Sequence, residues 1–147
     1  EALFVAEPTL DLQLRADRFL PPAPIHVVLD AGGEEATLDT DAVQNLQAAD
    51  PAVLDMPQVQ QLLPTLLQRA REIAEAQAPT IGARARRQMR RELEPVVTRL
   101  QGLSETNPAV GTVELDAARA ELQQLDEGLL APRVRLDGLR LILLLEE

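Results

Sequence analysis

Side chains able to do covalent or acid–base chemistry are few and widely separated in this chain. Its 147 residues include one histidine, His26, one serine, Ser104, and neither cysteine nor lysine. A serine nucleophile needs a base within hydrogen-bonding reach and a third group that orients that base. Without lysine and cysteine, P-loop, Schiff-base, thiol and thiolate–zinc chemistry are excluded. We therefore expect no catalytic residue, no bound cofactor and no metal ion in this chain.

One segment concentrates positive charge. Five arginines occur within residues 84–91, and helical spacing places Arg84, Arg87 and Arg91 on one face. This face is a candidate contact for a partner protein or for phosphate groups. The alternative is a solvated helix flank whose arginines pair with acids of a facing helix, such as Asp116, Glu121, Asp126 and Glu127. The alternative is favoured, because no aromatic residue is interleaved for base stacking and the chain is acidic.

Other polar clusters have simpler interpretations. Adjacent acids such as Glu34 and Glu35 are typical of turns, and the Gly32-Gly33 pair is typical of a hairpin turn with positive φ. Phosphate-binding loops need more glycines and a following helix. A hydrolase built on His26 and a distant carboxylate remains the lowest-ranked hypothesis.

The overall charge limits the classes of partner. Twenty-four acidic residues against 14 arginines give a net charge of −10. Such a chain is repelled by nucleic acid and by anionic membrane surfaces, so any nucleic-acid binding is expected to be weak. The longest apolar run, residues 141–145, is far shorter than the roughly 20 residues of a membrane span. We expect a soluble, cytoplasmic piece of a larger protein.

The first 38 residues have strand character. An apolar run at residues 3–6 is followed by Leu10, Leu12 and Leu14, which alternate with polar residues. Prolines crowd residues 21–24 and exclude both helix and regular ladder pairing. The apolar, β-branched residues 25–29 then precede the Gly32-Gly33 turn and a return strand at residues 35–38.

The rest of the chain has helical character. A short helix is expected over residues 41–49, followed by a proline-bracketed connector. A long helical stretch begins near residue 57 and contains Pro64, Pro79 and Pro95. An interior proline removes a hydrogen bond, so we expect a break or kink near Pro79 and place Pro64 in or near a first turn.

Two apolar seams with alternating spacings of three and four residues predict a helical hairpin. The first consists of Ile81, Ala85, Met89, Leu93, Val96, Leu100 and Leu103. The second consists of Leu115, Ala118, Leu122, Leu125, Leu129, Pro132, Leu136, Leu139 and Leu143. An Asn107-Pro108 turn separates them, a helix start is expected near Thr112, and Pro132 should end the second helix.

The predicted fold class is therefore α+β, with a small antiparallel β-sheet followed by long helices that form an antiparallel helical hairpin. We divide the chain into a β lobe (residues 1–38), a short helix with its connector (residues 39–56) and the hairpin (residues 57–147). The end of the hairpin segment, residues 141–145, could form helix or strand.

Three segments of this sequence resemble a known family. They are ADRFLPPAPIHVVLD at residues 16–30, NPAV at residues 107–110 and RLDGLRLI at residues 135–142. Together they are similar to the C-terminal region of the RapA family of bacterial RNA polymerase-associated proteins, which are SWI/SNF-type helicase-like motors. Gly111 and Gly138 depart from the family pattern, which usually has Arg and Ala there.

The resemblance implies an accessory or interaction domain, with no enzymatic activity in this fragment. Family members bind core RNA polymerase and use ATP hydrolysis on nucleic acid to help recycle polymerase during transcription. Their ATP and magnesium sites belong to upstream motor domains, which are expected partners of this chain together with polymerase. An arginine-faced nucleic-acid-binding arm is the alternative function. The matching motifs are interpreted as structural: Pro21 and Pro22 at a strand entry, Asn107 and Pro108 at the hairpin turn, and Arg135 and Asp137 at a helix end.

Overall fold

A computed structural model describes residues 1–10, 12–38, 43, 46–107 and 112–143 of the chain. Its elements are, in order, β1 (Ala2–Glu7), the 3-10 helices η1 (Leu12–Leu14) and η2 (Ala16–Arg18), β2 (Ala23–Val27), the 3-10 helix η3 (Pro51–Asp55), α2 (Pro57–Thr106), α3 (Thr112–Gly128) and β3 (Arg133–Leu139).

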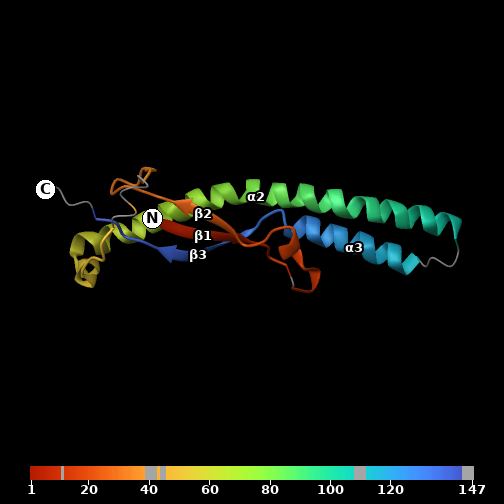
Figure 1. Cartoon of the computed structure of the whole chain (residues 1–147), viewed down its shortest axis with the longest axis horizontal. Coiled ribbons are helices and arrows are strands. Elements are labelled where there is room, and N and C mark those ends of the chain that lie inside the picture. Colours follow the sequence, from red (N-terminus) through yellow and green to blue (C-terminus); the bar gives the residue numbers. More distant parts are fainter. Residues whose placement is uncertain (11, 39–42, 44–45, 108–111, 144–147) are drawn as a thin grey trace. The chain divides into compact units, whose positions relative to one another are not determined.

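The strands form one antiparallel sheet in the order β2-β1-β3, with β1 in the middle (Figure 1). The predicted α+β fold, with an antiparallel sheet and two long helices, is confirmed. The third strand comes from the C-terminal part of the chain, so β1 pairs on one side with a segment that is very distant in sequence. Phe4, Val5 and Ala6 of β1 are buried, as expected for a central strand.

Three expectations for the first 38 residues were wrong. Residues 23 and 24 belong to β2, because an edge strand tolerates Pro24. Leu12–Leu14 form a 3-10 helix, although the leucines alternate with polar residues. Leu10 and Leu14 pack instead against the buried core of the helical hairpin. A run this short can bury its leucines there without pairing with another strand. The return strand at residues 35–38 is reduced to one antiparallel bridge, Leu29 to Glu35, after a turn in which Gly33 has a φ of +82°.

Helix α2 continues through all three of its internal prolines, so the break expected near Pro79 is absent. Pro64, Pro79 and Pro95 are all exposed. Each proline leaves one carbonyl without its helical donor, and on an exposed face water can supply that hydrogen bond. Ala78 and Ala85, before and after Pro79 in the sequence, are buried, so the helix is packed on both sides of the proline.

The chain folds as two compact units. Unit 1 contains residues 1–5, 24–76 and 135–147, and unit 2 contains residues 6–23 and 77–134. Neither unit is one continuous stretch of sequence, and α2 contributes its first turns to unit 1 and its later turns to unit 2. Of the short helix expected over residues 41–49, residues 41, 42, 44 and 45 lie outside the described residues, while residues 46–49 are not helical, so the helix does not extend to residue 49. Residues 141–143 are neither helix nor strand.

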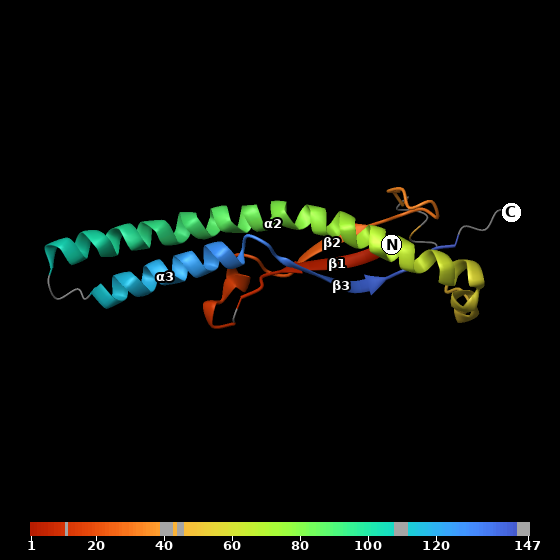
Figure 2. The same cartoon turned by 180° about the vertical axis from the view of Figure 1, so that it is seen from behind.

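Unit 2 is the helical hairpin with the segment that precedes β2 packed on it. Helices α2 and α3 lie side by side in two opposite views (Figures 1 and 2). The buried core consists of Ala16, Phe19, Leu20, Ala85, Met89, Leu125 and Leu129. Core burial of this kind contributes about 25 cal/mol per Å² of apolar surface. The hairpin is therefore held by aliphatic packing with a single aromatic ring.

The predicted seams are confirmed in the half of the hairpin that packs against Phe19 and Leu20. Ala85, Met89, Leu125 and Leu129 are buried, as the spacing requires. Toward the tip Leu115 is still buried, but the facing seam of α2 is looser, because Val96 and Leu103 are 47% and 39% exposed. The seam does not continue past Pro132, because Leu136 and Leu139 belong to β3. That part of the heptad interpretation was wrong.

A close backbone approach makes Gly82 a sensitive position of α2. A Cβ atom there would clash with the Leu129 carbonyl oxygen and would lie 2.9 Å from Cδ of Pro132. The segment that leaves α3 can pack this closely only because residue 82 has no side chain.

We predict that Gly82→Ala destabilises the chain by about 1–3 kcal/mol through overpacking, despite the ~1 kcal/mol by which alanine favours a helix. Gly102→Ala on the same helix is the matched control, since a Cβ there meets nothing within 4 Å. The control should be neutral or stabilising by up to about 1 kcal/mol. Urea unfolding followed by circular dichroism measures both, and equal midpoints for the two variants would contradict the close approach.

Candidate functional site

The packing of α2 on α3 decides which arginines are available to a partner. Arg84, Arg87 and Arg91 are exposed, whereas Ala85 and Met89 between them are buried. Within the part of the chain that the structure describes, none of the three forms an ion pair. They form a row about 10 Å long at the helical rise of 1.5 Å per residue. We call these three residues the arginine face.

The neighbouring arginines are committed to the hairpin itself. Arg86 donates hydrogen bonds from Nε and Nη2 to the two Asp126 carboxylate oxygens, at 3.2 and 2.5 Å. Arg90 donates to the same two oxygens at 2.7 and 2.9 Å. Two bidentate pairs on one carboxylate are charge-assisted and fix the geometry of all three side chains. The expected pairing with acids of the facing helix thus holds for Arg86 and Arg90 with Asp126, and not for the arginine face.

This clamp, formed by Arg86, Arg90 and Asp126, also perturbs protonation. The hydrogen bonds from Arg90 and Arg86 hold the pKa of the Asp126 carboxyl well below its ordinary value, although partial burial opposes this. The same hydrogen bond and charge raise the pKa of Arg90. Asp126 is therefore ionised at any physiological pH, and both arginines stay directed toward α3.

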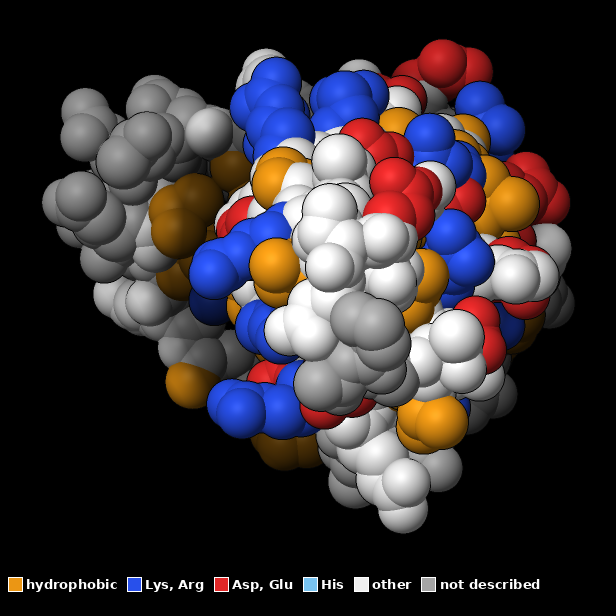
Figure 3. All heavy atoms as spheres, turned by 90° about the vertical axis from the view of Figure 1, so that its right-hand side faces the viewer, with side chains coloured by type: hydrophobic (Ala, Val, Ile, Leu, Met, Phe, Trp, Pro, Cys, Tyr) orange, Lys and Arg blue, Asp and Glu red, His pale blue; other side chains and the backbone are white. Residues whose placement is uncertain are grey.

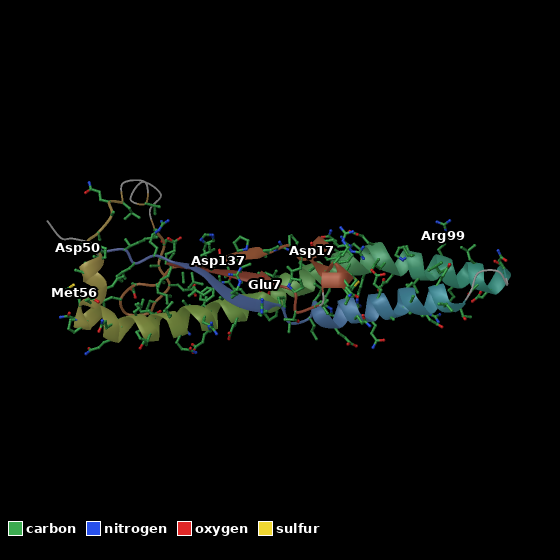
Figure 4. All side chains as sticks on the ribbon, turned by 90° about the horizontal axis from the view of Figure 1, so that it is seen from below. Glu7, Asp17, Asp50, Met56, Arg99 and Asp137 are labelled. Carbon is green, nitrogen blue, oxygen red and sulfur yellow. The ribbon has the colours of Figure 1, made fainter. Side chains whose placement is uncertain are left out.

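Away from the clamp, the charges at the hairpin end are mixed. Figure 3 looks at the end of α2 and the beginning of α3, where arginine and acidic side chains are interspersed. Arg99 is exposed and points away from α3 (Figure 4). In this view both signs of charge appear among the described residues.

The segment RFLPP, which carries part of the family resemblance, anchors unit 2. Phe19 and Leu20 are buried in the hairpin core. The guanidinium of Arg18 lies 4.5 Å from the centroid of the Phe19 ring and its Nη2 donates to Glu121 of α3 at 2.9 Å. Sequence reasoning selected the prolines of this motif and missed these anchors. The signal was present, since Phe19 is one of only two aromatic residues in the chain.

The other residues predicted from the motifs lie in different places. Pro21 and Pro22 are exposed and directly precede β2. The backbone N–H of Asn107 donates to the Leu103 carbonyl at 2.8 Å and so closes the last turn of α2. Pro108 lies outside the described residues. Arg135 and Asp137 form an ion pair of 2.9 Å on β3, so their expected place at a helix end was wrong.

The two residues considered for hydrolytic chemistry already have structural neighbours. His26 Nδ1 lies 3.6 Å from Glu1 Oε1 on the exposed side of β2, and Ser104 donates to the carbonyl of Gln101 at 2.8 Å. Across the described residues, no group of three or more His, Asp or Glu side chains is placed to hold a metal ion. None of the helices described is both long and apolar enough to cross a membrane.

Asp126→Asn tests the clamp. The substitution should lower the free energy of unfolding at neutral pH by about 1–2 kcal/mol, because charge-assisted bonds partly shielded from water are lost. A lowered folded-state pKa contributes stability that is complete above the unfolded value near 4 and lost as pH falls through the folded value. The difference between the native chain and the variant should therefore shrink below about pH 4.

Asp116→Asn is the matched control, since Asp116 is an exposed acid of α3 with no ion pair among the described residues. Thermal melts from about pH 2 to 8 compare the three proteins across the range in which carboxyl groups titrate. A native melting temperature in Asp126→Asn, or equal losses in both variants, would contradict the clamp.

Comparison with known proteins gives a consistent result over the whole chain. A sequence family described as RNA polymerase recycling family C-terminal matches residues 1–144. The RNA polymerase-associated protein RapA of Yersinia pestis (strain Pestoides F) is 29% identical over 147 residues, which cover 97% of this chain and 15% of that protein. The protein of the same name from Yersinia pseudotuberculosis serotype O:1b (strain IP 31758) matches with the same identity and coverage.

The chain thus spans about 15% of the length of the curated relatives that it matches. The match covers both units, including the anchor at residues 16–20 and the strand β3. This chain belongs to the C-terminal family of RNA polymerase recycling proteins, RapA_C.

Proposed function

We propose that the chain is a non-catalytic accessory domain of a cytoplasmic, helicase-like ATPase that associates with RNA polymerase and helps to recycle it during transcription. The observation that carries this proposal is the family match over residues 1–144. In this proposal ATP and magnesium bind only in the motor domains of the parent protein. The domain itself contacts core polymerase, those motor domains, or both.

The arginine face is the proposed contact. Arg84, Arg87 and Arg91 are exposed and carry charges that no described acid neutralises. The apolar seam and the clamp on Asp126 together determine which face of α2 the three arginines occupy. A row of guanidinium groups suits carboxylates of a protein surface or phosphates, both of which arginine can bind in a bidentate manner.

Binding to phosphates is the second candidate function, and the same row of unpaired arginines favours it. The acidic balance of the chain opposes it, since nucleic acid would meet a net charge of −10. We therefore rank contact with a protein first.

A titration of the 147-residue chain against bacterial core RNA polymerase, at two salt concentrations, tests the proposal. We predict that the triple change Arg84→Ala, Arg87→Ala, Arg91→Ala weakens binding by about tenfold, since each exposed charge contributes up to about 1 kcal/mol. The control triple Arg69→Ala, Arg71→Ala, Arg99→Ala removes the same charge from exposed positions of the same helix. It should bind nearly as the native chain does.

Equal losses in the two triples would mean that net charge alone drives binding, and would contradict a specific contact at the arginine face. Binding that survives both triples would place the polymerase contact elsewhere on the domain. Absence of binding by the native chain would leave it as an internal support of the motor. In a parallel titration with duplex DNA, a salt slope that falls by about 0.9 for each arginine removed would instead favour phosphate contact.

A further inference from the structure

Unit 1 contains an apolar groove that differs from the arginine face in its residues and in its composition. The groove encloses about 520 Å³. One wall is the beginning of α2. Another is the end of β2 with the chain on both sides of the Gly32-Gly33 turn, residues 27–31 and 36–38. The third is the segment of residues 139–143. Apart from Glu1, Asp30, Thr37 and Arg140, all the lining residues are aliphatic or alanine.

The α2 wall is a half-buried helical stripe with an exposed leucine beside it. Val59, Leu63, Leu66 and Ala70 recur at spacings of three and four residues and are joined in the lining by Leu62 and Leu67. Ala70 is buried, whereas Leu62 is 44% exposed. The stripe is about 16 Å long at 1.5 Å per residue. Its members Val59, Leu63 and Leu66 are only half-buried within unit 1.

The wall formed by residues 139–143 also leaves apolar side chains exposed. Leu139, Leu141 and Leu143 are all exposed. Leu54 and Met56, immediately before α2, are also exposed, and Figure 4 shows Met56 at the beginning of α2. Exposed leucines that line one groove, here Leu62, Leu139, Leu141 and Leu143, are typical of a protein interaction site.

The charge of unit 1 selects the chemistry of the occupant. Its residues include 13 acids and four arginines, a balance of −9, whereas unit 2 has a balance of −1. Arg140, the cation of the lining, is paired with Glu1 at 3.4 Å. Asp30 of the lining and the adjacent exposed acids Glu34 and Glu35 have no cation within ion-pair distance among the described residues.

We call Asp30, Glu34 and Glu35, at the turn that borders the groove, the acidic rim; these acids beside an aliphatic surface disfavour several occupants. A second copy of the chain would bring another balance of −9 to the same surface, and nucleic acid or an anionic lipid surface would also be repelled. Complementary charge is supplied by lysine and arginine side chains that flank apolar ones. An amphipathic helix with that pattern is a common partner for a hydrophobic groove.

We propose that the groove of unit 1 binds a basic amphipathic helix of a partner protein, with leucine-type side chains on the groove and Lys or Arg along the acidic rim. The proposal does not depend on the contact with polymerase, since it concerns different residues in the other unit. About three turns of helix match the length of the α2 stripe.

The test uses two fluorescent synthetic peptides of about 14 residues, which is roughly four helical turns. Both place Leu at positions i, i+4, i+7 and i+11, and the first has Lys at the flanking positions while the second has Glu. Fluorescence anisotropy is recorded with the native chain at two salt concentrations. We expect saturable binding of the Lys peptide, weakened by salt, and about tenfold weaker binding of the Glu peptide.

Variants of the chain locate the binding site. Leu62→Ser combined with Leu139→Ser should weaken binding of the Lys peptide by about tenfold. Val113→Ser, a change at an apolar residue of unit 2 that is 77% exposed, should leave it unchanged. Should the double variant fail to fold by circular dichroism, Glu34→Lys combined with Glu35→Lys changes only exposed side chains next to the Gly32-Gly33 turn and should weaken binding of the same peptide.

Equal binding of the two peptides, or no binding of either, would overturn the proposal. So would equal losses in the groove variant and in Val113→Ser. Sedimentation of the native chain that shows self-association, abolished by Leu62→Ser, would identify a second copy as the occupant and would also overturn it. No outcome involves polymerase, so failure here and failure of the proposed function remain distinguishable.

Discussion

Aliphatic packing of α2 against α3 is the constraint on which the rest of unit 2 depends. Met89, Leu125 and Leu129 are fully buried, and the small residues Gly82 and Ala85 allow the chain segments to approach closely. This packing fixes the rotation of α2. Arginines at the edge of the seam then reach Asp126, whereas the other arginines of the same segment remain in solvent. The division between structural and available arginines therefore follows from the position of the apolar residues.

Much of this arrangement could be predicted from the sequence, because it is local. The alternation of three and four residues predicted which residues of the hairpin are buried nearest the core, and the Gly32-Gly33 pair predicted the turn where Gly33 has positive φ. The arginine spacing predicted a common face for Arg84, Arg87 and Arg91. In each case the signal lies within a few turns of one helix or within one turn of the chain.

The wrong expectations concern long-range pairing and short ambiguous runs. Leu136 and Leu139 fit a helical spacing, yet they lie in β3, because pairing with the distant strand β1 outweighs local pattern. The alternation of Leu12 and Leu14 is too short to specify a strand without a partner. Helix α2 passes through Pro79 because packing on both sides and solvent on the proline face offset the lost hydrogen bond. No short-range pattern in the sequence indicates this packing around Pro79.

The two units differ in the surfaces that they offer. Unit 2 is nearly neutral and presents the arginine face, whereas unit 1 is strongly acidic and presents an aliphatic groove. In the proposed function, these two surfaces would suit partners of different chemistry. The absence of aromatic residues from the groove lining and of lysine from the whole chain makes both surfaces unusually simple in composition.

The proposed function requires that the seam direct Arg84, Arg87 and Arg91 toward a polymerase contact. The chain has no cysteine, so one residue at a time can be labelled with an environment-sensitive fluorophore after Arg87→Cys or, as a control on the same helix, Arg99→Cys. The emission of each labelled chain is followed as bacterial core RNA polymerase is added. We predict a saturable emission shift at position 87 and none at position 99. A shift at position 99 with none at position 87 would contradict a contact at the arginine face.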